Sequence, residues 1–223
     1  MIFVNFKTYK EASGKNAVSL AQTISDVAND SGIEIISCPQ TVDLKEVIKE
    51  VKLSGRPAGR QVWAQHVDAV ERGRATGWFP PEIAKEAGAK GVLLNHSEHK
   101  LSVGQLGETL SRCKDVGLKT LVFADAVDEA RVVAKFKPDY IGYEPPELVG
   151  SKTTSVALSK PEVIEEVVEA IPDTPVVVGA GVKHVNDVKV SLERGSKGIA
   201  LSSSVVLAEN PKKVLEDLVS GFK

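Results

Sequence analysis

The stretch GVLLNHSEHK, residues 91–100, changes character in the middle. Its first four residues form an apolar run without polar alternation, and five polar residues, Asn95 to His99, follow directly. Such a short apolar run is typical of a strand in a parallel sheet that is covered on both faces. The polar residues then lie where the strand ends. They could form a metal site or an acid/base site, or simply cap a buried strand.

Seven other short runs rich in Val, Ile and Leu alternate with segments of helical periodicity. We expect strands at 2–4, 33–37, 61–64, 91–94, 120–124, 140–143, 176–179 and 198–201. We expect helices at about 17–28, 42–51, 81–87, 103–116, 127–136, 161–171, 184–194 and 211–222. The helix at 161–171 is predicted to begin with a capping box formed by Ser159 and Glu162.

Eight strand-helix units in 223 residues leave about 28 residues for each unit, close to the minimum for a strand, a helix and two short loops. This predicts an α/β fold, a (β/α)8 barrel that forms a single domain over residues 1–223. An open, doubly wound sheet is the alternative.

Composition and charge exclude several classes of function. The 28 basic and 30 acidic residues are mixed along the chain and give a net charge of -2, so we expect neither a nucleic-acid nor a membrane partner. The first ten residues, MIFVNFKTYK, lack the apolar core of a signal peptide, which predicts a cytoplasmic protein. The two cysteines, Cys38 and Cys113, are expected to be free buried thiols. Small molecules are therefore the expected partners.

Polar or backbone-exposing residues follow five of the eight predicted strands. In a (β/α)8 barrel the active site lies at the carboxyl ends of the strands, so these residues should face one pocket. A lysine there could be a solvated loop residue, or a fixed cation for a phosphate or an oxyanion. The residues are Asn5 and Lys7, Asn95 to Glu98, Glu144, Gly179 and Gly181, and Ser202 to Ser204.

His96 is the strongest acid/base candidate because of its place at the end of the fourth strand. The simpler alternative is a histidine that caps the following turn. The spacing of His96 and His99, H-x-x-H, also occurs in metal sites, but zinc sites usually show more ligands at suitable spacing. His66 and His184 lie elsewhere in the sequence. We therefore expect no metal, and we expect His99 to be a surface residue.

Glu144 ends the sixth predicted strand, and Pro145 and Pro146 follow it. A residue before proline is pushed towards an extended conformation, so Glu144 should project from the strand end. It is either a salt-bridge partner or a partly buried carboxylate suited to be a base. The connection from Pro145 to about Ser159 is predicted to be structureless, and long loops of this kind are often lids.

The last two strands end in small residues. Gly179 and Gly181 follow the seventh strand, and Ser202 to Ser204 follow the eighth. Each motif alone could be a tight turn or a helix cap. Their placement after the last two strands favours a phosphate site built from backbone amides.

Taken together, these residues resemble the triosephosphate isomerase family, in its archaeal form. The resemblance covers essentially the whole chain, with the motifs in the expected order. It implies a TIM barrel and an aldose-ketose isomerase that interconverts glyceraldehyde 3-phosphate and dihydroxyacetone phosphate through an enediolate, in glycolysis and gluconeogenesis. The motifs are NFKTY at 5–9, AQHVD at 64–68, NHSE at 95–98, EPPEL at 144–148 and GAG at 179–181.

The family is a standard example of pKa tuning in an active site, and the following roles come with the resemblance. It implies that Glu144 is the base and that neutral His96 polarises the carbonyl. Lys7 and Asn5 would stabilise the enediolate, with Glu98 ordering the site near Lys7. It implies a lid after the sixth strand and no metal or organic cofactor. Amides that would hold the phosphate lie around Val149, Gly150, Gly181, Ser202 and Ser203.

The chain departs from the family pattern at two places. Members of this branch generally carry glycine where Ser204 stands, and another glycine early in the lid, where this chain has Lys152 and one extra residue before Pro161. The loop with Thr76 to Phe79 resembles the segment that reaches into a neighbouring subunit, which implies a homodimer or homotetramer. Packing of that loop onto its own barrel is the alternative.

Rival functions remain open at this point. Another phosphate-binding barrel, such as a sugar-phosphate epimerase or an aldolase, would need a metal, paired carboxylates or a lysine inside the barrel. A non-enzymatic phosphate sensor would not need Asn5, Lys7, His96 and Glu144 all to be present.

Overall fold

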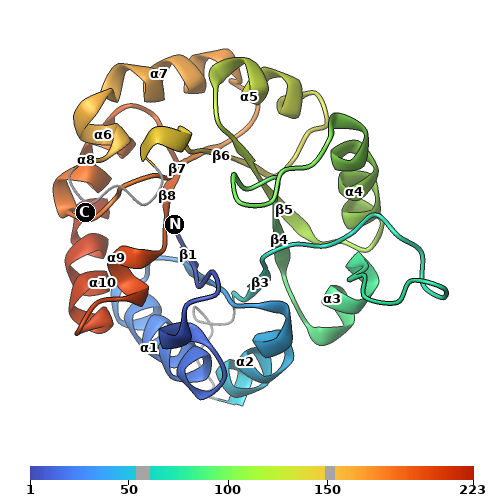
Figure 1. The fold of residues 1–223 in the computed structure, drawn as a ribbon. Coiled ribbons are helices and arrows are strands. Elements are labelled where there is room, and N and C mark those ends of the chain that lie inside the picture. The colour runs from blue at the N-terminus through green and yellow to red at the C-terminus, as the bar shows by residue number, and fades with distance from the viewer. Residues whose placement is uncertain (54–60, 149–153) are drawn as a thin grey trace.

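The strands of the chain form a parallel barrel surrounded by helices (Figure 1). The computed structural model describes residues 1–53, 61–148 and 154–223. The eight strands are hydrogen-bonded in the order β2-β1-β8-β7-β6-β5-β4-β3, and a parallel bridge between Ser37 and Val62 joins the two ends of this series. The strands are β1 (Ile2–Asn5), β2 (Ile35–Cys38), β3 (Trp63–Ala64), β4 (Gly91–Leu94), β5 (Lys119–Ala124), β6 (Tyr140–Tyr143), β7 (Val176–Val178) and β8 (Gly198–Leu201).

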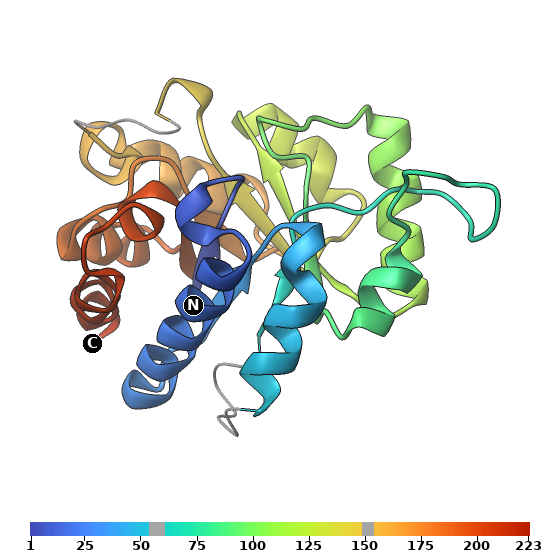
Figure 2. The same ribbon diagram turned by 60° about the horizontal axis from the view of Figure 1, so that its bottom comes forward.

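Helices follow the strands and lie on the outside of the barrel, as two views agree (Figures 1 and 2). The α-helices are α1 (Lys15–Ser31), α2 (Thr41–Leu53), α3 (Pro81–Ala87), α4 (Val103–Asp115), α5 (Val127–Ala134), α6 (Val156–Ser159), α7 (Pro161–Ala170), α8 (Val185–Glu193), α9 (Ser203–Val206) and α10 (Pro211–Val219). The 3-10 helices among the described residues are η1 (Lys10–Ala12), η3 (Pro146–Leu148) and η4 (Ser220–Phe222). No helix among the described residues is long and apolar enough to cross a membrane.

The predicted architecture is confirmed, and the open-sheet alternative is wrong, because the bridge between Ser37 and Val62 brings β2 and β3 together. Strands β4, β6 and β8 and helix α3 have the predicted bounds. Strand β3 is shorter than predicted.

Two local predictions in the connection after β6 are wrong. The connection is not structureless, because η3 and α6 lie within it. Ser159 does not cap α7: it belongs to α6 and its hydroxyl donates to the carbonyl of Ser155 at 2.7 Å. The residue that precedes α7 is Lys160, and Pro161 fills the first helical position, where a missing N–H costs nothing.

The barrel interior below the strand ends is filled by large aromatic side chains. The rings of Phe3 and Trp63 lie 5.1 Å apart in an edge-to-face arrangement, and both also lie near Tyr140. A Cβ at Gly91 would lie 2.5 Å from the Trp63 ring, and one at Gly142 would lie 2.7 Å from a neighbouring ring, that of Phe123. Glycine at these strand positions therefore makes room for the aromatic layer.

A second apolar layer packs between the strands and the helices. The helices bury one face each; in α1, for example, Leu20, Ile24 and Val27 are buried at helical spacing. Both cysteines are free and buried, as predicted. Burial raises the pKa of Cys113 to about 12, and it also raises the pKa of Cys38, so both remain thiols.

Candidate active site

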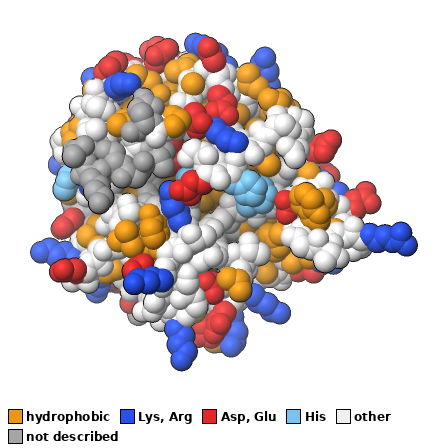
Figure 3. All heavy atoms as spheres, in the orientation of Figure 1, with side chains coloured by type: hydrophobic (Ala, Val, Ile, Leu, Met, Phe, Trp, Pro, Cys, Tyr) orange, Lys and Arg blue, Asp and Glu red, His pale blue; other side chains and the backbone are white. Residues whose placement is uncertain are grey.

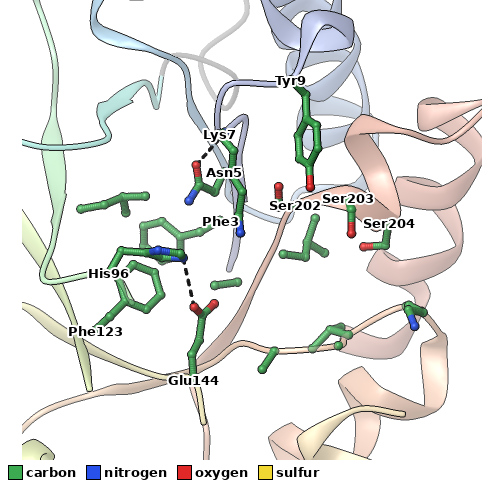
Figure 4. A pocket seen from close by; sticks show the side chains of 17 residues that line it. Phe3, Asn5, Lys7, Tyr9, His96, Phe123, Glu144, Ser202, Ser203 and Ser204 are labelled. Carbon is green, nitrogen blue, oxygen red and sulfur yellow. Dashed lines mark hydrogen bonds and ion pairs between the residues drawn. The ribbon is translucent and has the colours of Figure 1, made fainter. Parts of the chain in front are cut away.

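A pocket of about 60 Å³ lies at the carboxyl ends of the strands. Basic, acidic and histidine side chains meet near the middle of this face of the molecule (Figure 3). Residues from the ends of β1, β4, β6, β7 and β8 contribute to its wall, so the five predicted strand ends meet at one place. Its lining includes Asn5, Lys7, Tyr9, His96, Glu144, Gly181 and Ser202 to Ser204 (Figure 4).

Lys7 has a strained backbone that neighbouring side chains hold in place. Its φ is +46°, a left-handed conformation that is uncommon for a residue with a long side chain. Its amide donates to Oδ1 of Asn5 at 2.9 Å. Nε2 of Gln65 lies 3.1 Å from the Lys7 carbonyl and 3.2 Å from the same Asn5 oxygen. Asn5 thus orients Lys7 through Oδ1.

The ammonium group of Lys7 lies 2.6 Å from Oε1 of Glu98. The lysine side chain is 16% exposed, whereas that of Glu98 is 56% exposed. An ion pair with one well-solvated partner contributes little to stability, so its main effect is to fix the direction of the lysine. Glu98 therefore contacts Lys7, as the resemblance implied.

His96 is buried beside Phe123, whose ring meets it edge to face at 5.0 Å. Its Nδ1 accepts the backbone amide of Glu98 at 3.1 Å. A ring nitrogen that accepts a hydrogen bond from an amide carries no proton, so this contact favours the neutral tautomer with the proton on Nε2. Nε2 faces Glu144, with its oxygen Oε2 at 3.3 Å.

Asn95 shapes the turn that presents His96. Its φ is +57°, and its side chain bridges two neighbouring segments. Nδ2 donates to the carbonyl of Phe123 at 2.8 Å and to Oε1 of Glu129 at 2.9 Å, while Oδ1 accepts the amide of Leu101 at 3.0 Å. Asn95 is 2% exposed, so these bonds satisfy a buried amide and fix the chain on which His96 lies.

Glu129 anchors this arrangement as a charged carboxylate. Burial opposes its ionisation, but hydrogen bonds from the Asp125 amide, from Lys100 and from Asn95 outweigh it and lower the pKa of Glu129. Lys100 lies 3.0 Å from the Glu129 carboxylate. Asn95 therefore does more than follow the end of the strand: with Glu129 it holds the turn that carries His96.

Glu144 is a buried carboxylate with one unsatisfied oxygen. It is 7% exposed, and the 3.3 Å approach to His96 lacks hydrogen-bond alignment, so Oε2 has no hydrogen-bond partner among the described residues. A Cβ at Gly179 would lie 2.0 Å from Oε1 of Glu144. Glycine at 179 therefore makes room for the carboxylate. A buried, unsatisfied carboxylate is costly, which is typical of a functional group.

The opposite wall of the pocket consists of Ala180, Gly181 and the serines after β8. Ser202 has a buried hydroxyl oxygen without a hydrogen-bond partner among the described residues. Figure 4 shows the hydroxyl of Tyr9 and the side chains of Ser202 to Ser204 directed into the same pocket. This wall offers hydroxyl groups and backbone amides, and with Lys7 it suits an anion.

Some predicted residues do not take part in this geometry. Val149 and Gly150, predicted to bind a phosphate, and Lys152 lie outside the described residues. His99 does not join His96: its ring stacks on that of His66 with centroids 4.0 Å apart. Within the described ranges, no group of three histidine, cysteine or acidic side chains could hold a metal ion.

Two residues of the site went unnoticed in the sequence, and a third, Gly179, was named there without its steric role. Gln65 and Tyr9 lie inside the AQHVD and NFKTY motifs, but their contacts join segments that only the fold brings together. The role of Gly179 is steric and is visible only once Glu144 is in place. The pattern GAG indicated a turn but not the neighbour that requires it.

The fold and the site define a (β/α)8 barrel whose mouth combines an acid/base pair with a pocket suited to a small anion. The comparisons with known proteins agree with this class. The triosephosphate isomerase family model matches residues 1–220. The chain belongs to the triosephosphate isomerase family.

Three curated relatives, all named triosephosphate isomerase, cover nearly the whole chain. That of Methanopyrus kandleri is 41% identical over 100% of this chain and 97% of its own length. That of Methanothermus fervidus is 39% identical over 99% of this chain and 97% of its own. That of Methanocaldococcus jannaschii is 36% identical, with 98% of both chains covered. All three are archaeal, in agreement with the branch indicated by the motifs.

Proposed function

We propose that this protein interconverts glyceraldehyde 3-phosphate and dihydroxyacetone phosphate, as an aldose-ketose isomerase of glycolysis and gluconeogenesis. One observation carries the proposal: Oε2 of Glu144 lies 3.3 Å from Nε2 of His96, in a pocket that Lys7 also lines. Residues from three different strand ends contribute to this cluster. Family membership agrees with it.

In the proposed reaction Glu144 removes a proton from the carbon next to the carbonyl of dihydroxyacetone phosphate. The electron pair of that C–H bond forms the carbon-carbon double bond of an enediolate. The carbonyl electron pair moves to its oxygen, which gains a proton as the hydroxyl oxygen on the first carbon loses one, and return of the carbon proton from Glu144 to the other carbon then gives glyceraldehyde 3-phosphate. The carboxylate suits this role because Oε2 has no hydrogen bond within the described part of the chain and can accept a proton.

His96 and Lys7 stabilise the negative charge that develops on oxygen. With Nδ1 of His96 occupied by the Glu98 amide, the proton on Nε2 can donate to the substrate carbonyl. The Lys7 ammonium group supplies a fixed positive charge on the same pocket. Among the described residues Asn5 Nδ2 has no hydrogen-bond partner, so it can donate as well. Fixed donors of this kind act without reorganisation during the reaction.

The substrate phosphate is proposed to lie against Gly181, Ser202 and Ser203; Val149 and Gly150, which lie outside the described residues, are proposed to bind it from the sequence alone. The buried hydroxyl of Ser202 has no hydrogen-bond partner in residues 1–53, 61–148 and 154–223, and a phosphate oxygen would satisfy it. Ser204, which also lines the pocket, adds a third hydroxyl to this wall. Closure of a lid over this site remains a proposal from the sequence.

We also propose that residues 1–223 act as one domain in the cytoplasm and assemble as a homodimer or homotetramer. The loop between β3 and α3 extends away from the barrel (Figure 2). Trp78 in this loop is 56% exposed, and an exposed aromatic side chain in a protruding loop is typical of an interface. Light scattering coupled to gel filtration would measure the number of subunits.

The test is a coupled assay of the purified wild-type protein in both directions, with a metal chelator present. We expect turnover of both triose phosphates in chelator, with no other sugar phosphate formed. Binding without turnover would support the phosphate sensor instead, and release of a different product would support an epimerase or an aldolase.

A further inference from the structure

Asp187 is a buried carboxylate that the proposed reaction does not use. It lies in the first turn of α8 and is 1% exposed. One oxygen, Oδ2, accepts the backbone amides of Lys183 and His184, both at 2.8 Å. The other, Oδ1, accepts the hydroxyl of Ser155 at 2.6 Å, across 32 residues of sequence. Helix capping explains the two amides, but it does not explain the bond to Ser155.

The two segments that Asp187 joins meet at Gly181. A Cβ at Gly181 would lie 2.3 Å from the Thr154 carbonyl oxygen and 2.9 Å from Cα of Ser155. The backbone at 154–155 therefore packs directly against Gly181. A hydrogen bond from Ser155 to Asp187 fixes this contact from the outer side.

The loop between β7 and α8 needs such support because it is strained. Ala180 and Gly181 both have left-handed backbones, with φ of +63° and +80°. A residue other than glycine keeps this conformation only when surrounding contacts impose it. Two of those contacts are the amides of Lys183 and His184 on the Asp187 carboxylate, at the end of the loop.

We infer that Asp187 is a positioning residue for the phosphate side of the active site, acting with Ser155. It holds the loop at 180–184 so that Gly181 lines the pocket. This inference rests on the proposed function, because it assumes that the group bound at Gly181 is the substrate phosphate.

Because Asp187 is charged, the direction in which phosphate affinity changes on its substitution tests the inference. A carboxylate repels a phosphate, so removal of its charge alone should tighten binding. If Asp187 instead holds the loop, the neutral Asp187→Asn variant should weaken binding, because an amide cannot accept from two backbone amides and the Ser155 hydroxyl in the same way.

The experiment compares Asp187→Asn, Ser155→Ala and their combination in the full-length protein. Ser155→Ala leaves the charge of Asp187 unchanged, and Asp187→Asn leaves Ser155 as the cap of α6, so the two variants share only the bond between these residues. The measurements are kcat and KM for dihydroxyacetone phosphate, and calorimetric Kd values for glycerol 3-phosphate and glycerol.

For each single variant we expect KM and the Kd of glycerol 3-phosphate to rise about tenfold, the effect of losing one hydrogen bond to a charged group. The value of kcat should change less than about threefold, and glycerol should bind equally weakly to all variants. The double variant should lose less than the product of the two single effects. Ser155→Thr should retain wild-type KM because it keeps the hydroxyl.

Ser191→Ala is the matched control. The Ser191 hydroxyl is buried and donates to the backbone carbonyl of Asp187 at 2.7 Å, so its loss affects the same turn without touching the carboxylate. It should lower stability and leave KM unchanged.

An unchanged or lower KM in folded Asp187→Asn, or an equal rise in Ser191→Ala, would overturn the inference. Ser155→Ala removes only one hydroxyl, so it gives the same decision if Asp187→Asn does not fold. If the wild type failed to isomerise triose phosphates while the variants still weakened glycerol 3-phosphate binding, the proposed function would fail and the role of Asp187 would stand.

Discussion

The mouth of the barrel and the aromatic layer beneath it are built in different ways. At the mouth, Lys7, Asn95 and Ala180 follow their strands with left-handed backbones. Buried polar atoms of Glu144 and Ser202 lack hydrogen-bond partners in the part of the chain that the structure describes. Strained backbone and unsatisfied polar groups reduce stability, and both are typical of sites that bind or react.

The aromatic layer is built mainly by packing on unstrained strands, although Nε1 of Trp63 is also buried without a hydrogen-bond partner among the described residues. Phe3, Trp63 and Tyr140 contact one another with ring centroids 5.1 to 6.2 Å apart. Gly91 and Gly142 lie on strands without positive φ, and their small size serves only packing. The difference indicates that the packed layer supplies free energy of folding. This free energy offsets the cost of holding strained backbone and unsatisfied polar groups at the mouth.

Trp63→Ala should break the packed layer and have the largest effect. Trp63 is 2% exposed and fills the space above Gly91, so its removal leaves a large cavity. We expect the free energy of unfolding to fall by about 3–5 kcal/mol, measured by urea titration. Val42→Ala, at a side chain that is 84% exposed, is the control and should change it by less than about 0.5 kcal/mol. Equal losses in both variants would contradict the contrast between core and surface.

Lys7→Met should affect the mouth instead. Loss of one fixed donor to a developing oxyanion commonly costs about 10²–10³-fold in kcat. Stability should change little, since the partner Glu98 is 56% exposed and can be solvated. Steady-state kinetics and thermal unfolding measure the two effects. A variant with wild-type kcat would remove Lys7 from the reaction.

Gln65→Leu should sharpen the comparison, because Gln65 supports the strained backbone without lining the pocket. Its Nε2 lies within 3.2 Å of the Asn5 side chain and of two backbone carbonyls, those of Lys7 and Cys38. Losing these bonds should cost about 1–3 kcal/mol of stability and lower kcat/KM about tenfold. If activity stayed unchanged while stability fell, Gln65 would be structural only.

The smallest expected effect concerns the pH dependence of stability. Burial and the neighbouring charge of His99 lower the pKa of His66, although Asp68 opposes them. The unfolded chain then binds a proton before the folded one does, so stability is complete above about pH 6.5 and falls as the pH drops below that value.

His66→Gln should reduce this loss. Thermal unfolding at pH 8 and pH 5 measures it: the fall in Tm between the two should be smaller in the variant than in the wild type. An equal fall in Tm in both proteins would show that carboxylates, and not His66, govern the loss of stability at acid pH.

Much of the fold was predictable because the apolar runs in the sequence coincide with the strands of the barrel. The run 91–94 is apolar throughout and ends at Asn95, so the strand and its end coincide with the prediction. The catalytic candidates were predictable for the same reason, since the carboxyl ends of all strands meet at one mouth. The gathering of Lys7, His96 and Glu144 at one mouth therefore followed from strand ends alone, whereas their roles came with the family resemblance.

The supporting contacts were not predictable from spacing. Gln65 approaches Lys7 across 58 residues, and Ser155 reaches Asp187 across 32. The proposed capping box at Ser159 failed because a short helix, α6, precedes α7 and uses the Ser159 hydroxyl within its own turn. Such competition among neighbouring hydrogen bonds depends on tertiary packing, which a sequence pattern does not contain.

The central claim is that Glu144 is the base, and the kcat of Glu144→Gln tests it most directly. The amide has the shape of the carboxylate but cannot take a proton. We expect kcat to fall by at least about 10²-fold. The Kd of glycerol 3-phosphate should stay within about threefold of wild type, and stability should not fall, because Oε2 makes no hydrogen bond to the described residues. A Glu144→Gln variant with near-wild-type kcat would contradict this claim.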